Sequence, residues 1–147
     1  MQYHLNEGSF SLPASDWLDN SMNVLRDDAN GISVIVSRGP VPDGSDFEKE
    51  FHRQWDSMRE QMTHLQQSEF LRVSVGAGQQ IRAVEVTSQF ERNGQALYQH
   101  QLAVQVPQKN TLMVFTFSAL RPFTDEDAIR WDALKNTLAL HTPGQDA

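Results

Sequence analysis

Residue types that often carry catalysis are present in this chain, but their spacing matches no familiar catalytic arrangement. The five histidines never occur at the H-x-H or H-x-x-x-H spacing of metal ligands: His4, His52, His64, His100 and His141. The chain has no cysteine, which excludes disulfides, zinc–thiolate sites and thiol nucleophiles. It also lacks the G-x-S-x-G, P-loop and G-x-G-x-x-G motifs. We therefore expect no metal site, no cofactor and no enzymatic activity.

Two groups of carboxylates have structural interpretations. The acidic residues 125–127 follow Thr124, and this order is typical of a helix start, because threonine caps the helix and carboxylates complement its dipole. Glu85 lies on an otherwise fairly apolar face of a predicted strand, where burial could raise its pKa. A salt bridge from Glu85 to an arginine such as Arg72 or Arg130 is the alternative that we favour.

Composition excludes further classes of function. The chain has 147 residues, with 12 Lys and Arg against 19 Asp and Glu, and its net charge of −7 argues against a nucleic-acid partner. Hydrophobic residues make up 39% of the chain, yet no apolar run is long enough to span a membrane, so we expect no stable membrane insertion. Residues 1–8 lack the basic and apolar regions of a signal peptide. We expect one cytoplasmic domain over residues 1–147.

Alternation of apolar and polar residues predicts strands over much of the chain. The expected strands cover residues 3–12, 17–27, 32–38, 70–75, 81–92, 95–106 and 111–120. Asn93-Gly94 is a strong hairpin signal, because a type I′ turn needs positive φ at both central residues. A two-residue loop before the last strand would place Val104 opposite Phe115.

Two helices complete the predicted fold. Ser45 begins an S-x-x-E capping box, and apolar residues then recur every three or four positions, which predicts a helix over about residues 46–68. A second helix is expected after Thr124, with apolar residues that extend to Leu140. This order of elements indicates an α+β fold, in which a twisted antiparallel sheet has helices packed on one face. The second face of such a sheet is commonly free.

The free face would combine aliphatic side chains with neutral hydrogen-bonding groups and almost no charge. We call its strand residues the mixed face: Met22, Val24, Ser33, Ile35, Ser37, Val86, Ser88, Gln99, Gln101, Thr116 and Ser118. Gln54 and Gln61 of the first predicted helix would form its rim. Apolar surface patches above roughly a few hundred Å² mark interaction sites, so we interpret the mixed face as a client-binding surface. The alternative is that a second subunit or the N-terminal segment covers it.

The order of elements and three segments resemble the DcrB-like family, and within it the Eag chaperones of bacterial type VI secretion. The segments are SVIVSRG at 33–39, the predicted helix at 47–62 and QALYQ at 95–99. The resemblance implies a fold like that of the Mog1 and PsbP proteins and a homodimer. It also implies a chaperone that shields the N-terminal transmembrane helices of a toxin effector, beside its PAAR domain, until the effector is loaded on the VgrG spike.

Two other functions stay open at this point. One is a small-ligand carrier or enzyme that uses a pocket between sheet and helices. The other is a scaffold that binds a folded soluble protein. The effector chaperone that the resemblance implies would instead bind the detached N-terminus of an effector and would not bind its toxin domain.

Overall fold

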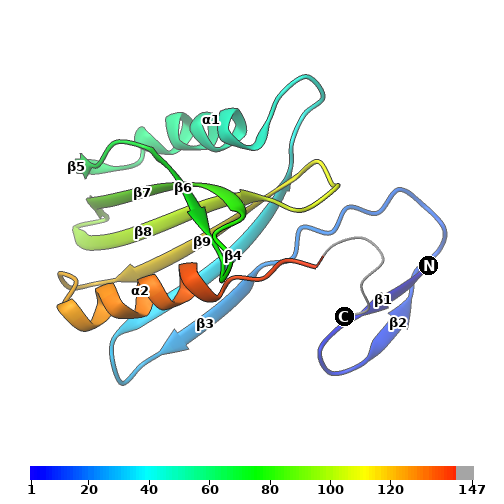
Figure 1. Cartoon of the computed structure of the whole chain (residues 1–147), viewed down its shortest axis with the longest axis horizontal. Helices are drawn as coiled ribbons and strands as arrows, with labels where there is room; N and C mark the ends of the chain where they lie inside the picture. The colour runs from blue at the N-terminus through cyan, green and yellow to red at the C-terminus, as the bar shows by residue number, and fades with distance from the viewer. Residues whose placement is uncertain (142–147) are drawn as a thin grey trace.

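The structure is a computed structural model that describes residues 1–141. Its centre is a seven-stranded antiparallel sheet in the order β3-β4-β9-β8-β7-β5, and β6 pairs with the same strand, β7, as β5 does (Figure 1). The strands are β3 (Asn23–Asp27), β4 (Ile32–Pro40), β5 (Thr63–Gln67), β6 (Leu71–Val75), β7 (Ile81–Arg92), β8 (Gln95–Gln105) and β9 (Thr111–Ala119). The helices are α1 (Phe47–Arg59) and α2 (Asp125–Thr137). The predicted α+β class and antiparallel sheet are confirmed.

The long β7–β8 hairpin has the predicted turn and register. Asn93 and Gly94 have φ values of 52° and 77°, and Ser88 lies opposite Gln99, which is the register that a two-residue turn at Asn93-Gly94 produces. The register between β8 and β9 was predicted wrongly, because Val104 pairs with Met113 and the loop between the strands is longer than two residues. Since this difference is two residues, every side chain keeps its expected face.

The N-terminal third differs more from the prediction. Instead of one strand over residues 3–12, β1 (Gln2–His4) and β2 (Ser9–Ser11) form a separate two-stranded sheet. The chain reverses at residues 5–8, where the Leu5 amide donates to the Gly8 carbonyl at 2.7 Å. This hairpin stands apart from the main sheet (Figure 1). The strand expected from residue 17 begins only at Asn23.

Helix α1 is shorter than predicted and has a different cap. Asp46, not Ser45, is the N-cap, and its side chain accepts from the Lys49 amide at 2.8 Å. The helix ends at Arg59, and residues 63–67 form β5, which pairs with the edge of β7. Met62 and Leu65 still contact the core from these positions. Their spacing from the apolar residues of α1 therefore matched that of a longer helix, although they lie outside it.

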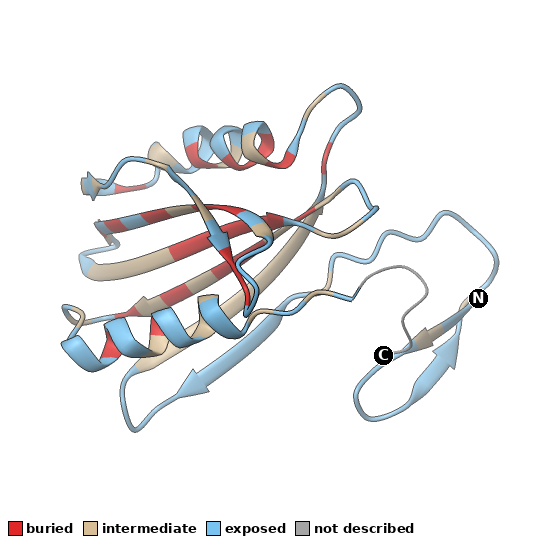
Figure 2. Cartoon of the chain, in the orientation of Figure 1, coloured by how far each residue is buried: buried red, intermediate tan, exposed pale blue. Residues whose placement is uncertain are grey.

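The helices divide between the two faces of the sheet, although they were expected together on one. Ala103 of β8 packs in the cluster with Phe51 and Trp55 of α1, whereas its neighbours Leu102 and Val104 pack in the cluster with Trp131 of α2. Successive side chains on a strand point to opposite faces, so α1 and α2 lie on opposite sides. Buried residues lie along the central strands and on the helix sides that meet them (Figure 2).

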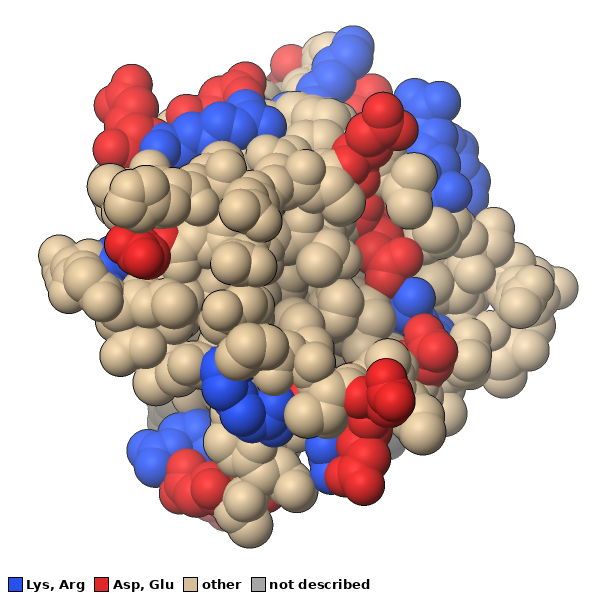
Figure 3. Space-filling model, turned by 90° about the vertical axis from the view of Figure 1, so that its left-hand side faces the viewer, with Lys and Arg blue, Asp and Glu red and all other residues tan. Residues whose placement is uncertain are grey.

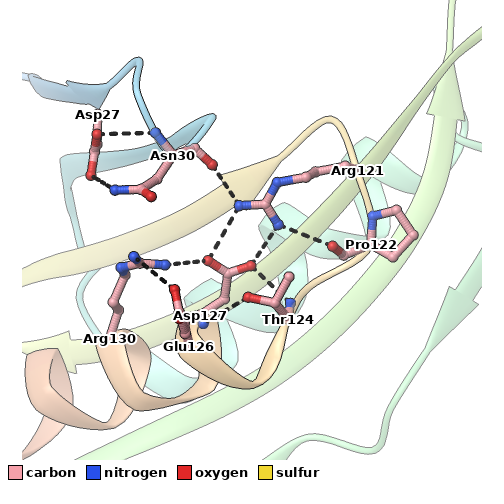
Figure 4. Close-up of polar contacts among 8 residues, drawn as sticks. All are labelled: Asp27, Asn30, Arg121, Pro122, Thr124, Glu126, Asp127 and Arg130. Carbon is pink, nitrogen blue, oxygen red and sulfur yellow. Dashed lines mark hydrogen bonds and ion pairs between the residues drawn. The ribbon is translucent and has the colours of Figure 1, made fainter.

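A buried ion cluster anchors the start of α2. Thr124 and Asp127 form a capping box, which confirms the predicted helix start. The Asp127 side chain is fully buried, and its carboxylate accepts from Arg121 at 2.6 Å and from Arg130 at 3.0 Å. Arg121 also donates to the Asn30 carbonyl in the β3–β4 turn, so the cluster joins that turn to the helix (Figure 4).

Glu85 has partners other than the arginines expected from the sequence. Its carboxylate accepts from the Trp131 indole at 2.5 Å and from the Lys135 ammonium at 2.8 Å. Arg72 pairs with Glu48 instead, and Arg130 lies in the cluster described above. Glu85 therefore links β7 to α2, and the predicted arginine bridge is wrong.

Candidate functional site

The mixed face is a set of rows that cross the sheet from strand to strand. Lateral pairing places Val24, Ile35, Thr116, Gln101 and Val86 side by side, on β3, β4, β9, β8 and β7 in turn. Because paired residues point to the same side of a sheet, these five side chains form one row on one face. The predicted residues on these five strands therefore do lie together on one face.

A second row on the same face, two residues further along each strand, is entirely polar. It runs through Ser33, Ser118, Gln99 and Ser88, and Gln67 of β5 extends it. Adjacent rows on one face are separated by two residues along a strand, or about 7 Å. Aliphatic and polar groups thus alternate over short distances, as expected for a surface that must contact both kinds of group.

Helix α1 covers one end of this face and leaves the rest accessible. Val86, which is only 1% exposed, lies in the α1 cluster, so it belongs to the core and not to an open surface. Ser33, Ile35 and Thr116 are half-buried. Val24 is 56% exposed at the sheet edge. The accessible surface therefore extends from the side of α1 to the edge strand β3.

Three buried polar atoms on this face have no hydrogen-bond partner among the residues described. They are the Ser88 hydroxyl and the side-chain carbonyl oxygens of Gln99 and Gln101. The amide group of Gln101 donates to the Thr116 hydroxyl at 3.0 Å, which aligns the glutamine and leaves its oxygen unpaired. A buried acceptor without a donor costs about 1–3 kcal/mol, so the face gains most from a partner that brings donors.

The remaining predicted residues lie at the border. Met22 precedes β3 and is 61% exposed. Gln54, on α1, is half-buried, and its amide lies 3.9 Å from the position that a Cβ on Gly39 would take. Gln61 is exposed just after the end of α1, and within residues 1–141 its side chain forms no hydrogen bond to the mixed face. Gln54 therefore fits the predicted rim better than Gln61 does.

Charge is confined to the margins of the face. None of its strand residues is charged, and Arg26, which lies opposite Ser33 on the edge strand, pairs with Asp28 at 3.0 Å. Seen from the side at the left of Figure 1, the molecule has a broad area without Lys, Arg, Asp or Glu, with charged groups around it (Figure 3). Little charge would have to be desolvated when a partner binds there.

Two residues of the face were missed by the sequence reasoning. Gln67 was expected in a helix, but β5 places it opposite Ser88. Leu97 lies opposite Phe90 and packs against the α1 cluster. Leu97 was not predicted as part of the site, although the two-residue turn at Asn93-Gly94 already places it opposite Phe90.

Two other kinds of feature, a metal site and a membrane-spanning helix, are absent from the part of the chain that the structure describes. Residues 1–141 contain no group of three His, Asp or Glu side chains placed to hold a metal ion. Neither α1 nor α2 is long and apolar enough to cross a membrane.

The comparisons with known proteins agree with this fold. The crystal structure of PA94, a protein of unknown function and proposed regulator from Pseudomonas aeruginosa, superposes with a TM-score of 0.70 and 19% identity over 96% of each chain. At that identity the likeness shows the fold alone. No curated protein matches the sequence. The family model described as DcrB matches residues 7–137, which is most of the chain. The chain therefore belongs to the DcrB family.

Proposed function

We propose that this protein is a cytoplasmic, non-enzymatic chaperone for a type VI secretion effector. It binds and shields the N-terminal transmembrane helices of the effector, beside the PAAR domain, and helps to load the effector on the VgrG spike. The single observation that supports this most directly is the mixed face, where exposed aliphatic groups stand beside buried acceptors that lack donors.

The chemistry of the mixed face suits a transmembrane helix as client. Such a helix exposes about 20 apolar residues, which must be kept from water before membrane insertion. Its small and polar residues, serine and threonine among them, carry hydroxyl donors that normally pair with neighbouring helices in a bilayer. Val24 and Ile35 offer apolar contact, and Gln99 and Gln101 offer acceptors once their buried side-chain oxygens turn toward the client. A charged surface would serve the apolar part of the client poorly.

The size of the face favours two copies of the chain for one client. The part of the row outside the α1 cluster, from Val24 to Gln101, crosses four strands, so its three spacings span about 14 Å. A transmembrane helix of about 20 residues is about 30 Å long. One face covers about half of that length, and we propose that a homodimer supplies the remainder.

A matched pair of substitutions on the edge strand tests the proposal. Val24 and Leu25 are neighbours of similar exposure, 56% and 60%, whose side chains point to opposite faces of the sheet. Each chain variant would be co-expressed with the detached N-terminal segment of an effector that has transmembrane helices beside a PAAR domain, and capture would be measured without detergent. We expect Val24→Asp to reduce capture at least severalfold and Leu25→Asp to leave it unchanged.

The outcomes separate the alternatives. Equal capture by both variants would remove the mixed face from the proposal. Capture of the folded toxin domain in place of the N-terminal segment would favour a scaffold for soluble proteins. Both variants alter exposed positions, so circular dichroism and the midpoint of urea unfolding should match those of the parent chain.

A further inference from the structure

The other face of the sheet contains a cavity that the proposed chaperone role does not use. It has a volume of about 600 Å³ and lies beyond the C-terminal end of α2, on the face that α2 covers. Val36, Met113 and Phe115 of the sheet line it together with Leu138 and Leu140 of the segment after the helix. Pockets for small organic ligands usually measure about 300–1,000 Å³. The cavity is thus apolar and of ligand size.

Two cations lie at this apolar cavity without acidic partners. Arg38 and Lys109 line it, and no Asp or Glu does. The Arg38 guanidinium donates only to neutral oxygens, the Ser21 carbonyl at 3.1 Å and the Asn23 side chain at 2.8 Å. Within residues 1–141 neither cation forms an ion pair. In a chain of net charge −7, this local excess of positive charge favours a bound anion.

A smaller cavity joins the first and contains the nearest carboxylate. Its volume is about 300 Å³, and Arg38, Lys109 and Met113 line both cavities. Asp19 lines this second cavity, where its carboxylate accepts from the backbone and hydroxyl of Ser21. Asp19 accepts from Ser21 and forms no ion pair with Arg38 or Lys109, although its negative charge still acts on Arg38. The two cations therefore still outnumber the one carboxylate near the larger cavity.

We propose that this cavity binds a small amphipathic anion, with an aliphatic tail over Met113 and Phe115 and a carboxylate between Arg38 and Lys109. An aliphatic carboxylate meets both features of the site, because its tail removes apolar surface from water and its head pairs with the two cations. The site lies on the face opposite Val24 and does not depend on the chaperone role.

Calorimetric titration with sodium decanoate tests the site, and decyltrimethylammonium is the control with the same tail and the opposite charge. We expect saturable binding of one decanoate per chain and much weaker binding of the cation. Lys109→Gln changes an exposed side chain with no hydrogen bond in the described structure, and combined with Arg38→Gln it should weaken decanoate binding about tenfold. Met113→Trp should abolish binding by filling the cavity.

Three controls keep the result interpretable. Thermal unfolding of each variant shows whether Arg38→Gln loosens the segment at Ser21. Val24→Asp, on the opposite face, should bind decanoate like the parent chain. A chain that ends at His141 tests whether residues 142–147 compete. The proposal fails if the parent chain does not bind decanoate, if the cation binds equally well, if the double variant binds normally, or if only the shortened chain binds.

Discussion

Replacement of Asp127 should be among the most damaging single changes in the described part of the chain. The Asp127 side chain has no exposed surface, and alanine would remove its contacts to Arg121, Arg130 and the Thr124 amide. Loss of one partner from a buried ion pair costs about 3–5 kcal/mol. The arginine side chains are 37% and 32% exposed and can be hydrated, so we expect the lower end, about 3 kcal/mol.

The matched control lies in the same helical turn. Asp125 is exposed and outside the cluster, so Asp125→Ala should cost only about 0.5 kcal/mol through the helix dipole. Urea unfolding followed by circular dichroism would measure both variants. Equal midpoints for Asp125→Ala and Asp127→Ala would refute the claim that the buried cluster, and not the charge at the helix start, holds α2 in place.

The pH dependence gives an independent check of the same cluster. The Arg121 guanidinium holds the pKa of the Asp127 carboxyl well below its ordinary value of 3.8. The folded-state pKa is lower than the unfolded-state pKa, so the ionised Asp127 carboxylate stabilises the fold. This stabilisation is complete above pH 4 and declines as the pH falls below 3.8. The parent chain should have a higher free energy of unfolding than Asp127→Asn, and this difference should shrink by about 1 kcal/mol between pH 5 and pH 3. A constant difference would contradict the assignment.

Four further changes test the core, two turns and one histidine. Trp55→Ala removes a side chain of α1 that is only 2% exposed, and it should lower the free energy of unfolding by about 4 kcal/mol in urea titrations. Gly76→Ala should cost about 2 kcal/mol in the same assay, because φ is +88° and the new Cβ would lie 2.9 Å from the Leu138 carbonyl oxygen. Gly44→Ala has a similar φ but open space and should cost less. Burial lowers the pKa of His100, so the folded state favours its neutral form. The melting temperature should therefore fall as the pH drops below 6.5, and His100→Gln should remove this part of the pH dependence of the melting temperature.

Local signals in the sequence were sufficient where one turn or cap decides the structure. Asn93-Gly94 determined the β7–β8 register, and with it the pairing of Ser88 with Gln99. Thr124 marked the start of α2 for the same reason, since its side chain caps its own helix. These features depend on residues close together in the chain, so no knowledge of the rest of the fold was needed.

Features decided by distant contacts were not predictable in this way. Met62 and Leu65 continue the helical spacing of α1, but residues 63–67 instead pair with the open edge of β7. The amphipathic pattern of α1 also does not say which face of the sheet it covers. That choice follows from the contacts of Phe51 and Trp55 with β7, β8 and β9, and it decided which residues of the mixed face stay accessible.

The split of the helices between the two faces constrains how this protein can vary. In strand β8, Leu102 and Val104 point to the α2 core, and the alternate residues Gln101 and Ala103 point to the other face. Insertion of a single residue into β8 would turn the glutamines toward the α2 core and the core residues toward the mixed face. We therefore expect relatives with this fold to vary the mixed face by substitution at alternate strand positions, or by changes of length in the loops, and not by insertion within the strands.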